Sequence, residues 1–170
     1  EGNPVLQPET ALETQGDQHS ATPKDGGVWW DPAEGVFKMW YEAGWCGSHA
    51  YAVSEDGIHW KRPQLDLRPP TNQILPNLTG DSGAVVPDFE AEDPAQRFKM
   101  LVREGNEAAG SSWAQANCMI SADGIHWSEP VKTGAVGDRT AMFYNPFRKK
   151  WVYSIRGYGK GIGRARHYRE

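Results

Sequence analysis

A seven-residue motif occurs twice in the chain and limits its possible folds more than any other feature. Residues 54–60 read SEDGIHW, and residues 121–127 read SADGIHW, 67 positions further on. Gly can adopt a positive φ and Asp can accept hydrogen bonds from the backbone that follows it, so an Asp-Gly pair turns one strand back on the next. The Trp that ends each copy is expected to pack beneath the turn. The motif therefore predicts repeated antiparallel units, with His59 and His126 as turn residues and not ligands.

Two further series of short segments repeat along the chain. Aromatic or β-branched runs occupy residues 37–42, 98–103 and 151–156, and a leading run precedes each of them at 27–30, 83–86 and 141–144. Asp-Pro or Asn-Pro turns separate the two series, at residues 31–32, 93–94 and 145–146. Short runs of this kind bounded by Gly and Pro are typical of strands and hairpins. No segment has an apolar stripe of helical period over three turns, so the sequence predicts an all-β protein.

The length of the repeat favours β-propeller blades. We expect about three four-stranded antiparallel blades within one partial propeller domain, residues 1–170. The blades are expected near residues 20–65, 80–130 and 137–170, the last of them incomplete. Because a propeller needs about four blades to close, we expect further blades from the rest of a longer chain or from self-association.

Composition excludes several classes of protein. No apolar run approaches the roughly 18 residues that span a bilayer, so we expect no membrane partner. Cys46 and Cys118 lack the spacing of metal ligands, and unpaired thiols are expected, with a single disulfide as the alternative. Residues 1–130 carry 8 Lys/Arg and 20 Asp/Glu, whereas residues 131–170 carry 10 and 2. We interpret the basic end as arginines on strand faces and expect no nucleic-acid partner, because no phosphate loop or aromatic–basic platform accompanies it.

The repeat resembles that of the five-bladed β-propeller glycoside hydrolases, the group of invertases, levanases and arabinanases. It is most similar to uncharacterised secreted bacterial proteins described as glycosyl hydrolase family 32 N-terminal-like. The resemblance rests on GVWWDP (27–32), FKMWY (37–41), the two motifs above, DPAQRFKM (93–100), GDRT (137–140) and YNPFR (144–148), and it covers about the first half of such a protein. The chain lacks the Asn-Asp-Pro-Asn box and the Glu-Cys pair of the invertase branch.

The resemblance implies a glycosidase whose paired carboxylates lie in the central funnel and act as nucleophile or base and as proton donor. An Asp precedes each leading run, and equivalent positions of successive blades face one axis. The candidate catalytic residues are Asp25, Asp81, Asp138, Glu42 and Asp17, where Asp17 competes with Asp25 for the role in the first blade and each has a turn or ion-pair role as its alternative. The alternative function is a carbohydrate-binding propeller without catalysis.

Candidate substrate-binding residues are aromatic rings that could stack on a sugar and polar groups that could hold its hydroxyl or carboxylate groups. They are His19, Trp30, Trp45, Arg103, Arg139 and Arg156. For the arginines, a salt bridge is the alternative. The expected partner is a carbohydrate substrate, with no cofactor and no metal site, although the resemblance allows a structural calcium in the channel. It also implies a secreted or periplasmic bacterial protein, and the chain as given has no leader.

Overall fold

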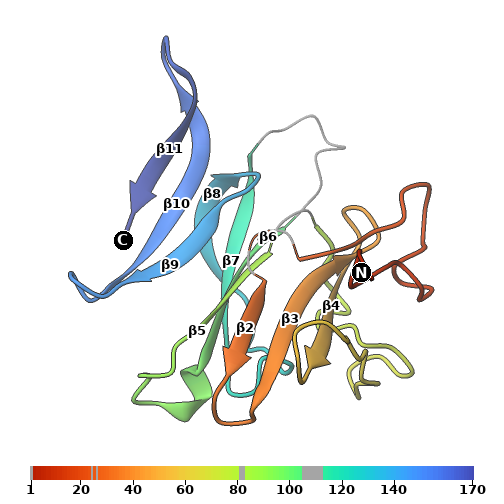
Figure 1. Cartoon of the computed structure of the whole chain (residues 1–170). Coiled ribbons are helices and arrows are strands. Elements are labelled where there is room, and N and C mark those ends of the chain that lie inside the picture. The colour runs from red at the N-terminus through yellow and green to blue at the C-terminus, as the bar shows by residue number, and fades with distance from the viewer. Residues whose placement is uncertain (1, 24, 26, 81–82, 105–112) are drawn as a thin grey trace.

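The computed structural model describes residues 2–23, 25, 27–80, 83–104 and 113–170, with the side chain of Trp113 excepted. These residues form eleven strands and one short 3₁₀ helix, arranged in three antiparallel sheets (Figure 1). The elements in chain order are β1 (Ala21–Thr22), β2 (Val28–Asp31), β3 (Val36–Ala43), β4 (Ser48–Ser54), β5 (Gly83–Pro87), η1 (Pro94–Gln96), β6 (Phe98–Glu104), β7 (Trp113–Ser121), β8 (Val131–Gly137), β9 (Ala141–Asn145), β10 (Lys150–Gly159) and β11 (Gly163–Arg169).

In the first sheet, β3 is the central strand. β1 pairs with the end of β3 and β2 pairs with its beginning, so the two short strands form one interrupted inner strand along the same edge. β4 pairs with the other edge of β3, and single bridges from Lys61, Gln73 and Thr79 extend the sheet beyond β4. The first unit therefore reaches past the end near residue 65 that the sequence predicted.

The second sheet has the strand order β5-β6-β7-β8, and the third has β9-β10-β11. β8 continues the second unit to Gly137, beyond the end near residue 130 that the sequence predicted. The reason is that the chain after Pro130 runs back along β7, with a change of register between Ala116 and Asn117. β8 contains small residues, including Gly134, and has no aromatic or β-branched run of the kind that predicted the other strands.

The three sheets pack face to face in chain order. One core cluster joins the first sheet to the second through Trp40, Val85 and Met100, and another joins the second to the third through Leu101 and Ile155. The innermost strands are neighbours, because Trp29 Nε1 in β2 donates to the Val85 carbonyl oxygen in β5 at 2.8 Å, and β5 in turn contacts β9. Sheets that meet along their inner strands in this way radiate from a shared side of the molecule (Figure 1).

The Asp-Gly turns have the structure that the motif predicted. Ser54 Oγ accepts a hydrogen bond from the Gly57 amide, and Asp56 Oδ1 accepts from the amides of Ile58 and His59 at 2.8 Å each. The same bonds recur in residues 121–126. His59 and His126 lie on the surface and contact the Asp of their own turn, at 2.7 Å in each copy. The turns are therefore structural elements of the repeat.

Candidate functional site

The inner strand of the first sheet and that of the third meet through Asp25 and Arg139. Asp25 lies in the interruption between β1 and β2, and Arg139 lies in the turn that precedes β9. Arg139 Nη1 is 3.7 Å from Asp25 Oδ1. Two residues far apart in the sequence, one before each of two inner strands, thus lie close together. We refer to this end of the inner strands as the hub.

Asp138 lies next to this contact and is held by Arg156. Both Nε and Nη2 of Arg156 contact Asp138 Oδ1. The turn is also fixed by Thr140, whose hydroxyl donates to the Gly137 carbonyl oxygen at 2.8 Å. A Cβ on Gly137 would lie 2.4 Å from the Arg156 carbonyl oxygen, so only glycine fits there. Asp138 is therefore a well-positioned carboxylate whose partner is Arg156.

The remaining candidate acids lie elsewhere or are not described. Asp81 lies outside the described residues. Asp17 and His19 are exposed in the loop before β1, where the amide of Trp45 donates to the Gln18 carbonyl oxygen at 3.2 Å. This bond places the loop beside the β3–β4 turn that carries the exposed Trp45 ring. The structure thus brings Asp25, and not Asp17, into contact with the third sheet.

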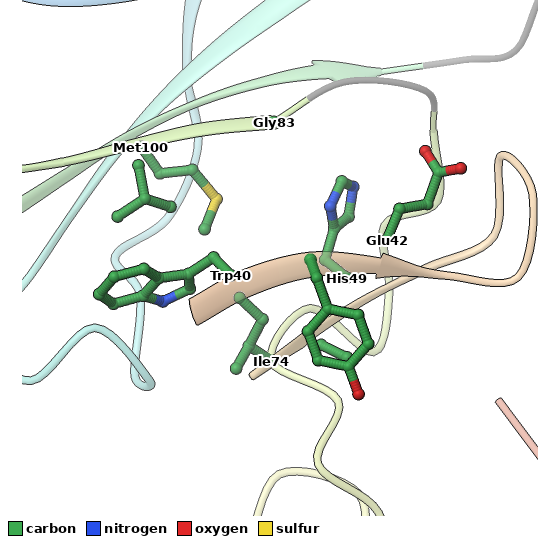
Figure 2. A pocket seen from close by; sticks show the side chains of 9 residues that line it. Trp40, Glu42, His49, Ile74, Gly83 and Met100 are labelled. Carbon is green, nitrogen blue, oxygen red and sulfur yellow. The ribbon is translucent and has the colours of Figure 1, made fainter. Parts of the chain in front are cut away.

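Glu42 lines a small cavity between the first two sheets together with His49, which the sequence analysis missed. The two residues are directly opposite each other in β3 and β4 (Figure 2). Glu42 is 4% and His49 7% exposed, and Glu42 Oε1 accepts from the Cys46 amide at 2.9 Å. A Cβ on Gly83, at the start of β5, would lie 3.3 Å from the His49 ring. The hairpin register around the Gly44–Gly47 turn could have revealed this Glu–His pair.

The cavity at Glu42 and His49 has a volume of about 20 Å³. A space of this size holds about one water molecule, so the cavity is too small for a sugar. Glu42 as placed here is a buried group beside the hub, and its assignment as proton donor remains a prediction.

Four arginines surround a larger cavity on the third sheet. It has a volume of about 310 Å³ and is lined by Asp138, Arg139, Arg156, Arg164, Ala165 and Arg166. Arg166 lies opposite Arg156 in the sheet, and its Nη1 donates to the Ser154 carbonyl oxygen at 3.1 Å. The structure therefore brings three of the predicted site residues, Asp138, Arg139 and Arg156, into one cavity and adds Arg164 and Arg166.

The other two predicted substrate-binding residues lie in different surroundings. Arg103, near the end of β6, is 2% exposed and lies on the face of the second sheet that packs against the third. Trp30 lies at the far end of β2 from Asp25, and its ring packs edge-on against Phe37 with centroids 4.9 Å apart. Trp30 thus lies apart from the carboxylates near the hub.

The part of the chain that the structure describes contains no group of three or more His, Cys, Asp or Glu side chains arranged to hold a metal ion. No helix there is long and apolar enough to cross a membrane. No disulfide joins Cys46 and Cys118.

Comparison with known proteins gives a structural match without a sequence match. No family model matches the chain, and no curated protein does. The β-fructofuranosidase from Schwanniomyces occidentalis, solved in complex with fructosyl-erythritol, superposes with a TM-score of 0.53 at 14% identity over 88% of this chain and 32% of its own. A variant fructofuranosidase from the same organism, complexed with fructosylnystose, gives 0.49 at 16% identity over 79% and 30%.

The chain spans about a third of the length of these enzymes. They are β-propeller glycoside hydrolases, and at this identity the likeness concerns the fold. It confirms the predicted fold class: the chain is an all-β protein built of antiparallel β-propeller blades.

Proposed function

We propose that this chain is part of a bacterial glycoside hydrolase, secreted or periplasmic, that cleaves a glycosidic bond of an oligosaccharide or polysaccharide at the hub. The observation that carries the proposal is the contact between Asp25 of the first sheet and Arg139 of the third, at 3.7 Å, with Asp138 adjacent in sequence. This contact supports the convergence of candidate acids from two repeats that paired-carboxylate hydrolysis requires. The fold, which this chain has in common with β-fructofuranosidases, supports the same proposal.

The contacts suggest how the residues divide the work. Arg156 contacts Asp138 through both Nε and Nη2 and so fixes the orientation of this carboxylate, which suits a nucleophile or a base. Asp25 lies 3.7 Å from Arg139, so this arginine can help to orient the second carboxylate. The reaction also needs a protonated donor, and Glu42 and Asp81 are the candidates that remain. A separation of about 5–5.5 Å between the two carboxyl groups leads to retention of the anomeric configuration, and one of about 6.5–9.5 Å leads to its inversion.

A carbohydrate-binding propeller without catalysis is the second candidate function. The observation that favours it is that two of the candidate catalytic carboxylates, Asp25 and Asp138, already contact arginines. Arginine–carboxylate pairs can hold sugar hydroxyls as well as promote a reaction.

Hydrolysis of a panel of neutral and acidic oligosaccharides, followed by release of reducing ends, tests the proposal. Asp138→Asn and Asp25→Asn are each expected to lower kcat by about 10³-fold or more, because loss of a nucleophile or base costs rates of this order. Asp17→Asn decides between the two acids proposed for the first blade. Glu92→Gln, in an exposed loop after β5, is the control.

Three outcomes are informative. If Asp138→Asn and Asp25→Asn hydrolyse as well as the parent, the catalytic assignment is wrong. Binding of a glycan without hydrolysis by the parent supports the second function. If no glycan is bound or cleaved, both functions are excluded.

A further inference from the structure

The arginine-lined cavity carries more positive than negative groups. Its lining has four arginines and one carboxylate, and Asp25 lies beside Arg139 as a second carboxylate. Among the residues that the structure describes, no carboxylate pairs with Arg164 or Arg166, so in this part of the chain these two cations of the cavity have no neighbouring anion.

Arg103 gives an independent indication of the same kind. It is 2% exposed, and its three guanidinium nitrogens have no hydrogen-bond partner among the described residues. A buried charge is costly unless a counter-charge or hydrogen bonds accompany it, so natural proteins rarely keep one without a use.

Arg103 lies in the second sheet, at the end that corresponds to the position of the arginine cavity in the third sheet. It follows Val102, which pairs with Gly83 at the start of the inner strand β5. Arg156 has the equivalent position in the third repeat, two residues after Ser154, which pairs with Ala141 at the start of β9. Arg103 and Arg156 therefore lie beside the starts of neighbouring inner strands, and β5 contacts β9. The arginine cavity and the buried Arg103 therefore both lie at the hub.

We propose that the hub binds an acidic glycan, one whose sugars carry a carboxylate or a sulfate ester, in preference to a neutral glycan. This inference rests on the function proposed above and specifies its substrate class. The guanidinium group presents two parallel N–H donors that match the two oxygens of a carboxylate or sulfate, and it stays charged at any physiological pH. Arg164 and Arg166 line the cavity in which such a group would bind. The glycan would also supply the anion that Arg103 lacks among the described residues.

Matched pairs of polysaccharides test the proposal. Affinity electrophoresis and calorimetry would compare polygalacturonate with its fully methyl-esterified form, and a sulfated galactan with the same galactan after desulfation. We expect at least tenfold tighter binding of one acidic member, and a loss of that advantage between 50 and 500 mM salt, as screening predicts. The preferred pair distinguishes carboxylate from sulfate recognition.

The outcomes separate this inference from the proposed function. Equal binding or hydrolysis of the acidic and neutral members overturns the acidic preference and leaves the glycosidase proposal intact. Binding of neither member, at any salt concentration, overturns both. Tighter binding of the neutral member also overturns the inference.

Variants locate the binding site. Arg103→Met and Arg164→Gln should each weaken binding of the preferred acidic polymer at least tenfold, and so reduce its advantage over the neutral form. Lys150→Gln is the matched control, because it removes one positive charge from the opposite end of β10. Arg103→Met should also keep or raise the thermal midpoint, since it removes a buried charge that has no hydrogen-bond partner among the described residues. A lower midpoint together with unchanged binding would assign Arg103 a structural role and overturn its part in the site.

Discussion

The indole Nε1–H of Trp40 in the first sheet donates a hydrogen bond of 2.7 Å to the carbonyl oxygen of Gly124 in the second. Gly124 belongs to the second copy of the Asp-Gly turn, and Trp40 is a buried residue of β3. The turn motif thus has a second role besides reversing the chain. It holds the second blade against the indole ring of Trp40 in the first blade. Lys38 strengthens this contact by donating to the Asp123 carbonyl oxygen at 3.3 Å.

Replacement of Gly124 should therefore destabilise the protein more than the same change in the first turn. A Cβ at Gly124 would lie 2.4 Å from Trp40 Cζ2, and φ is +81°. We expect Gly124→Ala to lower the free energy of unfolding by about 2–4 kcal/mol through backbone strain and overpacking. At Gly57, φ is +74° but the nearest atom is 3.6 Å away in Phe37. Gly57→Ala should cost only the strain, about 1–2 kcal/mol. Urea unfolding checks both, and equal losses would contradict the docking role.

Asp31 should be essential for the packing of the first two sheets. It is fully buried, its Oδ2 is 2.9 Å from Nζ of the buried Lys38, and its Oδ1 contacts Arg97 of the second unit. Asp31→Ala leaves Lys38 buried without this counter-charge, so we expect a loss of about 3–5 kcal/mol in the free energy of unfolding.

The exposed pair of Lys61 and Glu55, 2.9 Å apart, provides the control for Asp31. Lys61→Ala should leave the unfolding midpoint unchanged, because exposed ion pairs contribute little. If the two variants had similar unfolding midpoints, the Asp31 cluster would not be a determinant of stability.

Glu13 should make the protein sensitive to acid. It has no exposed surface, and its Oε1 accepts from Tyr41 Oη at 2.6 Å and from Arg62 Nε at 2.7 Å. Burial acts to raise the pKa of Glu13, but the hydrogen bonds from Arg62 and from backbone amides lower the pKa below its ordinary value. A lowered pKa in the folded state means that the stabilisation is complete above the unfolded-state pKa, about 4.3, and is lost as the pH falls through the folded-state pKa.

Glu13→Gln is therefore expected to be less stable than the parent at pH 7 and to lose less stability than the parent between pH 5 and pH 3. Urea unfolding across this range measures both effects. Glu9→Gln is the control, because Glu9 is mostly exposed and lies 3.4 Å from Arg62. Parallel pH profiles for Glu13→Gln and the parent would show that Glu13 does not cause the acid sensitivity.

His126 should stabilise the protein at low pH and not at high pH. Its Nδ1 is 2.7 Å from Asp123 and its Nε2 is 3.0 Å from Asp66, which belongs to the first unit. Hydrogen bonds to Asp123 and then to Asp66 raise the pKa of His126. For a raised pKa, the stabilisation is complete below the unfolded-state value, about 6.5, and is lost as the pH rises through the folded-state pKa.

Asp66→Asn should lower the pKa of His126 as measured by NMR titration, and its stability deficit should shrink from pH 5.5 to pH 8.5. The ring resonances of His59 at fixed pH should not shift in the same variant, because its turn contacts Asp56 and not Asp66. An unchanged pKa for His126 would show that the contact with Asp66 is not populated in solution.

Much of the fold could be predicted from the sequence because the decisive interactions are local. The Ser and Asp side chains of residues 54–59 bond backbone amides within three positions of themselves. Such bonds form wherever the motif occurs, so the turns and the strands on either side of them follow from spacing alone. The placement of the outer strand β8 was missed, since its small residues give no period.

The partners of the hub residues, in contrast, were decided by the tertiary structure. The repeat predicted that Asp25 and Asp138 approach one centre, but it did not predict that Asp138 would pair with Arg156 or that Asp25 would lie beside Arg139. Nor did it predict that Arg103 would be buried without a hydrogen-bond partner among the described residues. These relationships depend on how three sheets pack and twist around their inner strands. A repeat in the sequence determines each sheet, whereas the charges that meet between sheets are determined only when the sheets come together.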